Sequence, residues 1–399
     1  MANPRRQAGV LAPQVEGYRA WLVQRGYTTL TIRNMLKDLG QLGLWLSRQG
    51  LDAADLNEEQ LTRHLSDLQT AGRRRVAGPR GLVPLLTFLR EVGAVPAPPV
   101  ALSPVEALLL QYKSWMESER GLSASTILRY ENTARRFLVE QAMAGGVFAP
   151  DALTGADLNV FLLRECVRVS AGSAKGRVAE LRSLMRFLHL RGVLPMKLGG
   201  AVPPVGGWRF ASVPATVAPG AVQLLLERTP RHGPVGIRDF AILMLVARLG
   251  LRSIEVARLQ VDDVDWRCGE IVVRGKGRRE DRLPLPVDVG EALVAYLSQA
   301  RPPARSSHVF LTCKAPRGPI RADLVGDVVE RACLRAGLPR VGPHRLRHAL
   351  AADMLRRGAG LTAIGQVLRH QDLATTALYA KVDFVALRQV AQPWPQAAA

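Results

Sequence analysis

Cysteines and long apolar runs are scarce in this chain. Its four cysteines, among 399 residues, lie far apart and without CxxC spacing, so neither a disulfide framework nor a structural zinc site is expected. No apolar run reaches the roughly 18 residues that a membrane-spanning helix needs, and the first residues lack the apolar core of a secretory signal. These absences predict a cytoplasmic protein with reduced thiols and no membrane partner.

Acidic residues are few in relation to basic ones. The chain has 54 Lys and Arg against 34 Asp and Glu, which gives a formal net charge of +20. Such an excess favours an anionic polymer as partner, because each phosphate that a protein neutralises releases condensed counterions. Hydrophobic residues still make up 48% of the sequence, so a folded protein of two to four domains is expected.

Motifs of nucleotide-dependent and metal-dependent catalysis are also missing. The Gly275-Lys276 pair lacks both the earlier glycine and the following Ser or Thr of a Walker A loop. His344 and His348 have the spacing of a zinc pair, but there is no glutamate between them in the HExxH manner and no third ligand at a matching distance. The sequence therefore predicts neither a bound metal nor another cofactor.

Two segments rich in proline and glycine, 96–104 and 195–219, divide the chain. They predict three domains, over 1–96, 104–195 and 215–391. The first two have helical periodicity, with four helices each, and helices are expected to begin near Thr29 or Thr31 and after the cap candidates Ser123 and Ser125.

The first two domains share an order of aromatic, glycine and proline residues. Tyr18-Arg-Ala-Trp21 recurs as Tyr112-Lys-Ser-Trp115, and three further positions return after 99 residues: Phe88, Gly93 and Pro96 as Phe187, Gly192 and Pro195. The shared order favours duplication of one small helical module. Chance similarity of two amphipathic bundles is the alternative.

Basic residues are clustered between the expected third and fourth helices of each copy. They are Arg73, Arg74, Arg75 and Arg80 in the first copy and Lys175 and Arg177 in the second. Side chains and amides at a loop that enters a helix can bind phosphate together. A solvated turn explains any single arginine equally well, but the cluster in a basic chain favours contact with DNA.

The third domain has a mixed pattern. Residues 237–250 are apolar nearly all round, which predicts a buried helix. Two short β runs, 270–274 and 281–285, flank glycines that suit a hairpin turn, and further helices are expected from about 287, 322, 345, 361 and 374.

Six residues of this domain can together hold and attack a phosphodiester: Arg252, Lys276, His344, Arg347, His370 and Tyr379. Gly250 can end the buried helix and Ser253 can cap the next, so Arg252 lies at a junction where it can present its planar guanidinium to phosphate oxygens. Glu255, one turn on, can orient that guanidinium. Taken alone, Arg252 would more often be a surface ion pair.

The other candidate residues for phosphodiester chemistry can also be explained by ordinary structural roles. His344 and Arg347 are one turn apart after Pro343 and share a helix face, whereas His348 is expected to be a packing residue. Lys276, at the hairpin tip, can protonate a leaving oxygen, although the neighbouring Arg278 and Arg279 can reach DNA as well. The phenol of Tyr379 has an ordinary pKa of about 10, so it needs dense positive charge to become a nucleophile.

The order of these motifs resembles the tyrosine recombinase (phage integrase) family. The matching sequences are LGLRSIEVARL, GKGRREDRLPLP, HRLRH, and LRH followed nine residues later by tyrosine, within about 220–385. The resemblance implies a mostly α fold with a small β-sheet: two helical (SAM-like) N-terminal DNA-binding domains, over 1–96 and 104–195, followed by an α+β catalytic domain over 215–391.

The resemblance also implies the reaction. Tyr379 would attack a DNA phosphate to give a 3′-phosphotyrosyl link and a free 5′-hydroxyl, without a cofactor. Arg252 and Arg347 would stabilise the transition state, Lys276 would protonate the leaving oxygen, and His344 would assist proton transfer at the tyrosine. His370 would hydrogen-bond the phosphate.

A site-specific recombinase of a mobile element is therefore expected in the bacterial cytoplasm, associated with the nucleoid. Its partners would be double-stranded DNA and, in a homotetramer on paired sites, three further copies, with related recombinases as the alternative co-subunits. A type IB-like topoisomerase and a DNA-binding subunit without turnover of its own are the alternatives. Two features depart from the family: Arg369 replaces the usual glycine before the second histidine, and the leading domain looks like a second core-binding domain.

Overall fold

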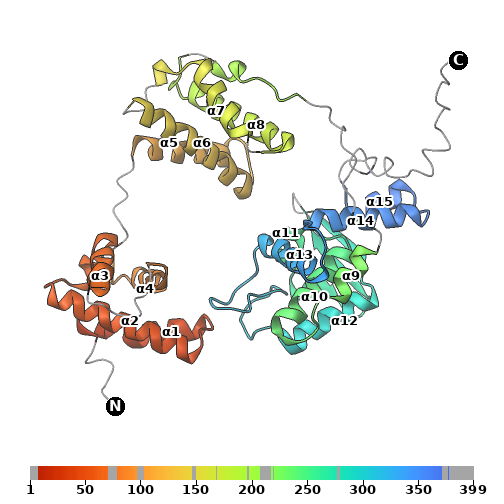
Figure 1. Cartoon of the computed structure of the whole chain (residues 1–399), viewed down its shortest axis with the longest axis horizontal. Coiled ribbons are helices and arrows are strands. Elements are labelled where there is room, and N and C mark those ends of the chain that lie inside the picture. The colour runs from red at the N-terminus through yellow and green to blue at the C-terminus, as the bar shows by residue number, and fades with distance from the viewer. Residues whose placement is uncertain are drawn as a thin grey trace. The chain divides into compact units, whose positions relative to one another are not determined.

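A computed structural model describes residues 8–70, 79–96, 103–145, 150–167, 169–195, 197–206, 217–218, 220–275, 279–370 and 376. The chain divides into two compact units, one over 98–211 and the other over 1–97 and 212–399. The fold is mostly α-helical with one three-stranded sheet, as expected (Figure 1). No helix among the described residues is long and apolar enough to cross a membrane.

The first helical module, residues 15–95, has four α-helices in the described chain. They are α1 (Val15–Gln24), α2 (Thr29–Arg48), α3 (Glu58–Thr70) and α4 (Pro79–Glu91), with a 3-10 turn at Ala53–Asp55 between α2 and α3. Thr28 caps α2, because its hydroxyl accepts a hydrogen bond from the Thr31 amide at 3.3 Å. The prediction that this helix begins near Thr29 is thus confirmed.

The second helical module, residues 104–194, repeats that order of elements. Its helices are α5 (Pro104–Ser118), α6 (Ala124–Gly145), α7 (Gly155–Val167) and α8 (Ala171–Leu190), with a 3-10 turn at Pro150–Ala152 between α6 and α7. Helix α6 begins directly after Ser123, so the alternative start after Ser125 is wrong. Lys175 and Arg177 lie inside α8 and not in the loop before it, which corrects their predicted placement.

Each module is built around the same aromatic trio. In the first, Tyr18 lies 5.2 Å from Phe88 and 5.9 Å from Trp21 between ring centroids; in the second, Tyr112 lies 5.1 Å from Phe187 and 6.0 Å from Trp115. Each trio joins the first helix of its module to the fourth, within a separate hydrophobic core. The residues that the repeat singled out are therefore the packing residues of both modules.

The third domain surrounds helix α10 (Gly233–Arg248), whose residues from Ala241 to Ala247 are all buried. Helices α12 (Val287–Ala295), α13 (Ala322–Ala336) and α14 (Pro343–Arg356) pack against it. The shorter helices are α9 (Ala221–Glu227), α11 (Ser253–Arg258) and α15 (Leu361–Val367). The apolar sequence of α10 is explained because helices cover it on several sides. The helix expected near 374 lies outside the described residues, apart from residue 376.

The sheet is antiparallel in the order β1 (Val264–Asp265), β2 (Glu270–Arg274) and β3 (Glu280–Pro284). Strands β2 and β3 form the expected hairpin, in which Arg274 pairs with Glu280 across the strands. The Gly275 amide closes the loop by a 2.8 Å hydrogen bond to the Arg279 carbonyl. Buried Asp263 forms an ion pair with Arg274, which anchors the end of β2 next to the hairpin loop.

We predict that the two helical modules unfold independently. Phe187→Ala should destabilise the second module by about 3–5 kcal/mol, because a buried ring leaves a cavity. Hydrogen exchange followed by mass spectrometry should then show faster exchange in α5 and α8. The matched variant Phe88→Ala should accelerate exchange in α1 and α4 alone; faster exchange in both modules from either variant would contradict the prediction.

Candidate active site

Arg252 lies at the N-terminus of α11, where a tight turn follows α10. Gly250 has a positive φ of 59°, and a Cβ at this position would lie 2.8 Å from Leu368 Cδ2, so the turn requires glycine. The Glu255 carboxylate caps α11: its Oε2 accepts from the Arg252 amide at 2.8 Å, and its Oε1 accepts from Arg252 Nη1 at 2.5 Å. The expected orientation of Arg252 by Glu255 is present, but Arg252 and not Ser253 occupies the cap position.

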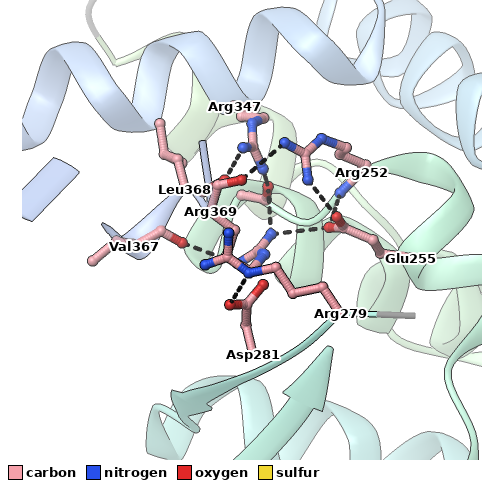
Figure 2. A network of polar contacts seen from close by, with 9 residues as sticks. Arg252, Glu255, Arg279, Asp281, Arg347, Val367, Leu368 and Arg369 are labelled. Atoms are coloured by element: carbon pink, nitrogen blue, oxygen red, sulfur yellow. Dashed lines mark hydrogen bonds and ion pairs between the residues drawn. The ribbon is translucent and has the colours of Figure 1, made fainter. Parts of the chain in front are cut away.

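Arg347 comes from the second turn of α14 and is 4% exposed. Its Nη1 donates to the Gly250 carbonyl and its Nη2 to the Leu368 carbonyl. Arg347 therefore joins the turn before α11 to the turn after α15, and brings its guanidinium beside that of Arg252 (Figure 2).

Arg369, in the turn after α15, completes the arginine cluster. Its Nη2 donates to Glu255 Oε2 at 2.9 Å, and its Nη1 donates to the Val367 carbonyl at 3.0 Å. The Arg369 carbonyl in turn accepts from Arg252 Nη2 at 3.3 Å. Figure 2 shows the guanidiniums of Arg252 and Arg369 bonded to the carboxylate of Glu255, with that of Arg347 beside Arg252, so the cluster carries an excess of positive charge.

The electrostatics of Glu255 follow from these contacts. Burial raises the pKa of its carboxyl, but the charge of Arg369 and the hydrogen bonds and charge of Arg252 outweigh that effect, so the pKa is lowered. Burial likewise lowers the pKa of Arg369, against the opposing effect of Glu255. The carboxylate is therefore ionised at neutral pH and holds both arginines.

His370 is half-buried directly after Arg369, and its Nδ1 lies 2.8 Å from the Thr376 hydroxyl. Burial, together with the charges of Arg347 and Arg252, lowers the pKa of His370 to about 4. The ring is therefore neutral at physiological pH, and it can act as a hydrogen-bond donor or acceptor without adding charge.

His344 lies on the exposed first turn of α14, one turn before Arg347. Desolvation lowers its pKa, and the charges of Arg347 and Arg252 lower it further. His348, half-buried one turn later, also has a lowered pKa, through desolvation and then through His344 and Arg347. A neutral His344 beside two arginines can accept a proton from a phenol.

The hairpin brings Arg279 to the same region. Arg279 Nε donates to Asp281 Oδ1 at 2.9 Å, and the side chain remains half exposed (Figure 2). The other predicted hairpin residues, Lys276 and Arg278, and the predicted nucleophile Tyr379 lie outside the described residues.

The predicted DNA contacts of the helical modules are only partly described. Arg73, Arg74 and Arg75 lie outside the described residues. Arg80 lies in the first turn of α4, and its side chain is not described. Lys175 is exposed on α8. Arg177 binds within its own module, donating from Nη1 to Glu180 Oε2 at 2.9 Å and to the Thr133 hydroxyl at 2.7 Å.

Two residues of the site were not assigned a role from the sequence. Thr376 was missed because its contact with His370, six positions earlier in the sequence, has no sequence signature. Arg369 was noted only as a departure from the family, since nothing in the sequence indicates that its side chain turns inward to Glu255. Among the described residues, no group of three or more His, Cys, Asp or Glu side chains is placed to bind a metal ion.

Arginines and neutral imidazoles on a helical domain with a small sheet define a centre that can activate a phosphodiester. Residues 217–385 match the family model described as the phage integrase family. The chain is 39% identical over 99% of its length to the putative integrase/recombinase y4rA of Sinorhizobium fredii, covering 97% of that protein. It is 30% identical over 72% of its length to the tyrosine recombinase XerD of Mycobacterium tuberculosis, covering 97% of that protein.

Solved structures show the same fold at lower identity. The XerH site-specific recombinase bound to palindromic difH substrate has a TM-score of 0.56 at 18% identity, covering 74% of this chain and 98% of that one. A lambda integrase dimer bound to a COC′ core site has a TM-score of 0.52 at 17% identity, covering 73% and 98%. The chain belongs to the tyrosine recombinase family, also called the phage integrase family.

We predict that His370 stays neutral down to about pH 5. Its pKa of about 4 lies below the ordinary value of 6.5, so the folded state binds this proton less readily than the unfolded state. The contribution of His370 to stability should be complete above pH 6.5 and should decrease as the pH falls from 6.5 towards 4. NMR titration of histidine-labelled protein, with His370→Gln to assign the signal, should give a midpoint well below 6; a midpoint near 6.5 would refute the prediction.

Proposed function

We propose that this protein is a site-specific DNA recombinase that cuts and rejoins strands through a 3′-phosphotyrosyl intermediate, with Tyr379 as nucleophile. The observation that carries the proposal is that the guanidiniums of Arg252 and Arg347 lie side by side, one held by Glu255 and the other by main-chain carbonyls (Figure 2). Two fixed guanidiniums can neutralise the non-bridging oxygens of a phosphate as charge develops on them. Membership of the tyrosine recombinase family supports the same reaction.

The proposed reaction is a transesterification. The Tyr379 oxygen forms a bond to phosphorus as the bond to the 5′ oxygen breaks. The phenolic proton passes to His344, whose lowered pKa leaves its ring neutral and able to accept it. Lys276 gives a proton to the departing 5′ oxygen. One phosphodiester replaces another, so the 5′-hydroxyl of a second strand can reverse the step without ATP.

His370 is proposed to hydrogen-bond the phosphate. If the Thr376 hydroxyl donates to Nδ1, the neutral ring carries its proton on Nε2 and can donate it to a phosphate oxygen. With that direction of the bond, Thr376 fixes both the orientation and the tautomer of the ring. Arg278 and Arg279 are proposed to contact DNA from the hairpin beside this site.

We further propose that the two helical modules are copies of one DNA-binding module. The common order of elements and the matching aromatic trios support a duplication. Arg73, Arg74, Arg75 and Arg80 of the first copy and Lys175 and Arg177 of the second are the proposed DNA contacts. The y4rA relative matches this chain over nearly its whole length, so it includes a comparable first segment.

The proposed assembly is a homotetramer on two double-stranded DNA sites, in the bacterial cytoplasm at the nucleoid, with related recombinases as possible co-subunits. The movement of a mobile element is the proposed biological role. The integrase of transposon Tn1549, in complex with circular intermediate DNA, is among the solved structures with this fold, at a TM-score of 0.51. Neither a topoisomerase nor a subunit without turnover is favoured by the relatives, whose names are integrases and recombinases.

A nicked suicide substrate tests the nucleophile. The 5′-hydroxyl leaves on a short fragment that diffuses away, so the covalent protein–DNA adduct accumulates. We expect an adduct with the wild type and none with Tyr379→Phe. Tyr27→Phe, which removes the hydroxyl of a half-buried tyrosine in the first module, is the matched control and should form the adduct at the wild-type rate. Equal adduct from Tyr379→Phe and wild type would exclude Tyr379 as the nucleophile.

The role of the first module is tested by Arg73→Ala, Arg74→Ala and Arg75→Ala in one chain. If these side chains bind phosphates, the slope of log Kd against log salt should decrease by about 2–3, and the footprint on DNA should shorten. The control is Arg63→Ala, which removes a guanidinium paired with Glu59 at 2.5 Å on α3 and should leave the slope unchanged. An unchanged slope and footprint in the triple variant would rule out DNA contact by this cluster.

A further inference from the structure

Arg369 has an unusual backbone conformation. Its φ is 55°, and it is the only residue other than glycine with a positive φ in the described parts of the chain. In this region the Cβ of an L-residue approaches the following carbonyl, so glycine is preferred there. A side chain retained in such a place needs a contact that glycine cannot make, and strained residues of this kind gather at functional sites.

The side chain of Arg369 is turned into the protein. The residue is 4% exposed, and its donors contact Glu255 Oε2 at 2.9 Å, the Val367 carbonyl at 3.0 Å and the Gly250 carbonyl at 3.4 Å. Unlike Arg347, whose two Nη atoms donate to main-chain carbonyls, this guanidinium is paired with a carboxylate of the site. It acts on the site through Glu255.

The charge of Glu255 explains why a second guanidinium matters. Glu255 is 3% exposed. Its Oε1 accepts from Arg252 Nη1 at 2.5 Å, and its Oε2 accepts from the Arg252 amide at 2.8 Å. With Arg252 as its only charged partner, the pair would present a neutral dipole to a phosphate. With Oε2 bound to Arg369 as well, two positive charges face one negative charge, and the excess remains with the Arg252 side of the cluster.

We propose that Arg369 is a positioning residue for strand cleavage: it offsets the charge of Glu255, so that this carboxylate fixes the Arg252 guanidinium without cancelling its attraction for the phosphate. The Arg369 carbonyl, which accepts from Arg252 Nη2 at 3.3 Å, gives a second link between the two residues. This inference rests on the proposed function, in which Arg252 binds the scissile phosphate.

Two variants separate the charge of Arg369 from its shape. Arg369→Lys and Arg369→Met both keep a long side chain and the same strained backbone, but only lysine keeps the charge. On the nicked suicide substrate at saturating protein, we expect Arg369→Met to form the covalent adduct at least tenfold more slowly than wild type. Arg369→Lys should remain within about threefold of wild type, since the positive charge of lysine also offsets the negative charge of Glu255.

A second substitution tests the route through Glu255. In the double variant Arg369→Met with Glu255→Gln, both opposing charges are gone, and the amide oxygen of glutamine can still accept from Arg252. The adduct should form at least fivefold faster than with Arg369→Met alone. A role of Arg369 in packing or folding predicts no such recovery. The slope of log Kd against log salt should not change in Arg369→Met, whereas direct phosphate contact would lower it by about one.

The possible outcomes are distinguishable. An adduct from wild type and none from Tyr379→Phe supports the proposed function, and equal rates for wild type and Arg369→Met would then overturn the role of Arg369 alone. Failure of Glu255→Gln to restore the rate would also overturn it. No adduct from wild type on its own element end would overturn the proposed function and this inference together. Thermal unfolding of each variant identifies any chain that fails to fold. If Arg369→Met fails to fold, the rates of adduct formation of Arg369→Lys and of the chain with Arg369, each carrying Glu255→Gln, decide instead.

Discussion

The buried carboxylate of Glu255 is the interaction on which the candidate site depends. An ionised group that is 3% exposed would be strongly unfavourable without partners. It has a backbone amide and two guanidiniums, from Arg252 and Arg369, which belong to segments more than a hundred residues apart. The pairing thus ties the start of α11 to the turn after α15. All of these partners are supplied by the protein itself, so the geometry of Arg252 is set by folding and not by DNA.

The Gly250 carbonyl has a comparable role for the backbone. It accepts from both Arg347 and Arg369, at the end of the buried helix α10. Because α10 is covered by other helices of the domain, its end is a fixed reference point. The close approach of Leu368 explains why this carbonyl can be reached from α14 and from the turn after α15. Packing of an apolar helix is therefore what places the cations of a polar site.

Much of this arrangement could be predicted from the sequence, because the apolar and glycine patterns report local structure. The buried helix, the hairpin and the pairing of Arg252 with Glu255 were predicted, and the structure has them. The cap of α11 was assigned to Ser253 from residue preference, but Ser253 is the first residue of the helix and Arg252 is the N-cap, whose amide donates to the Glu255 carboxylate. The inward turn of Arg369 could not be predicted, since it depends on long-range contacts with Glu255 and Gly250. Periodicity carries no information on such contacts.

The two helical modules show how one scaffold can keep its core while its polar surface changes. Their aromatic trios coincide, but the second module contains a buried carboxylate, Glu180, held by Arg129, Thr133 and Arg177. The sequence has Gly81 at the position 99 residues earlier, so the first module has no counterpart of this carboxylate. In the second module Arg177 neutralises Glu180. In the first module Gly81 stands at the matching position, so the arginines at 73–75 have no carboxylate there to neutralise. A shared core with separate charge patterns fits the proposal that the two modules contact different parts of one DNA site.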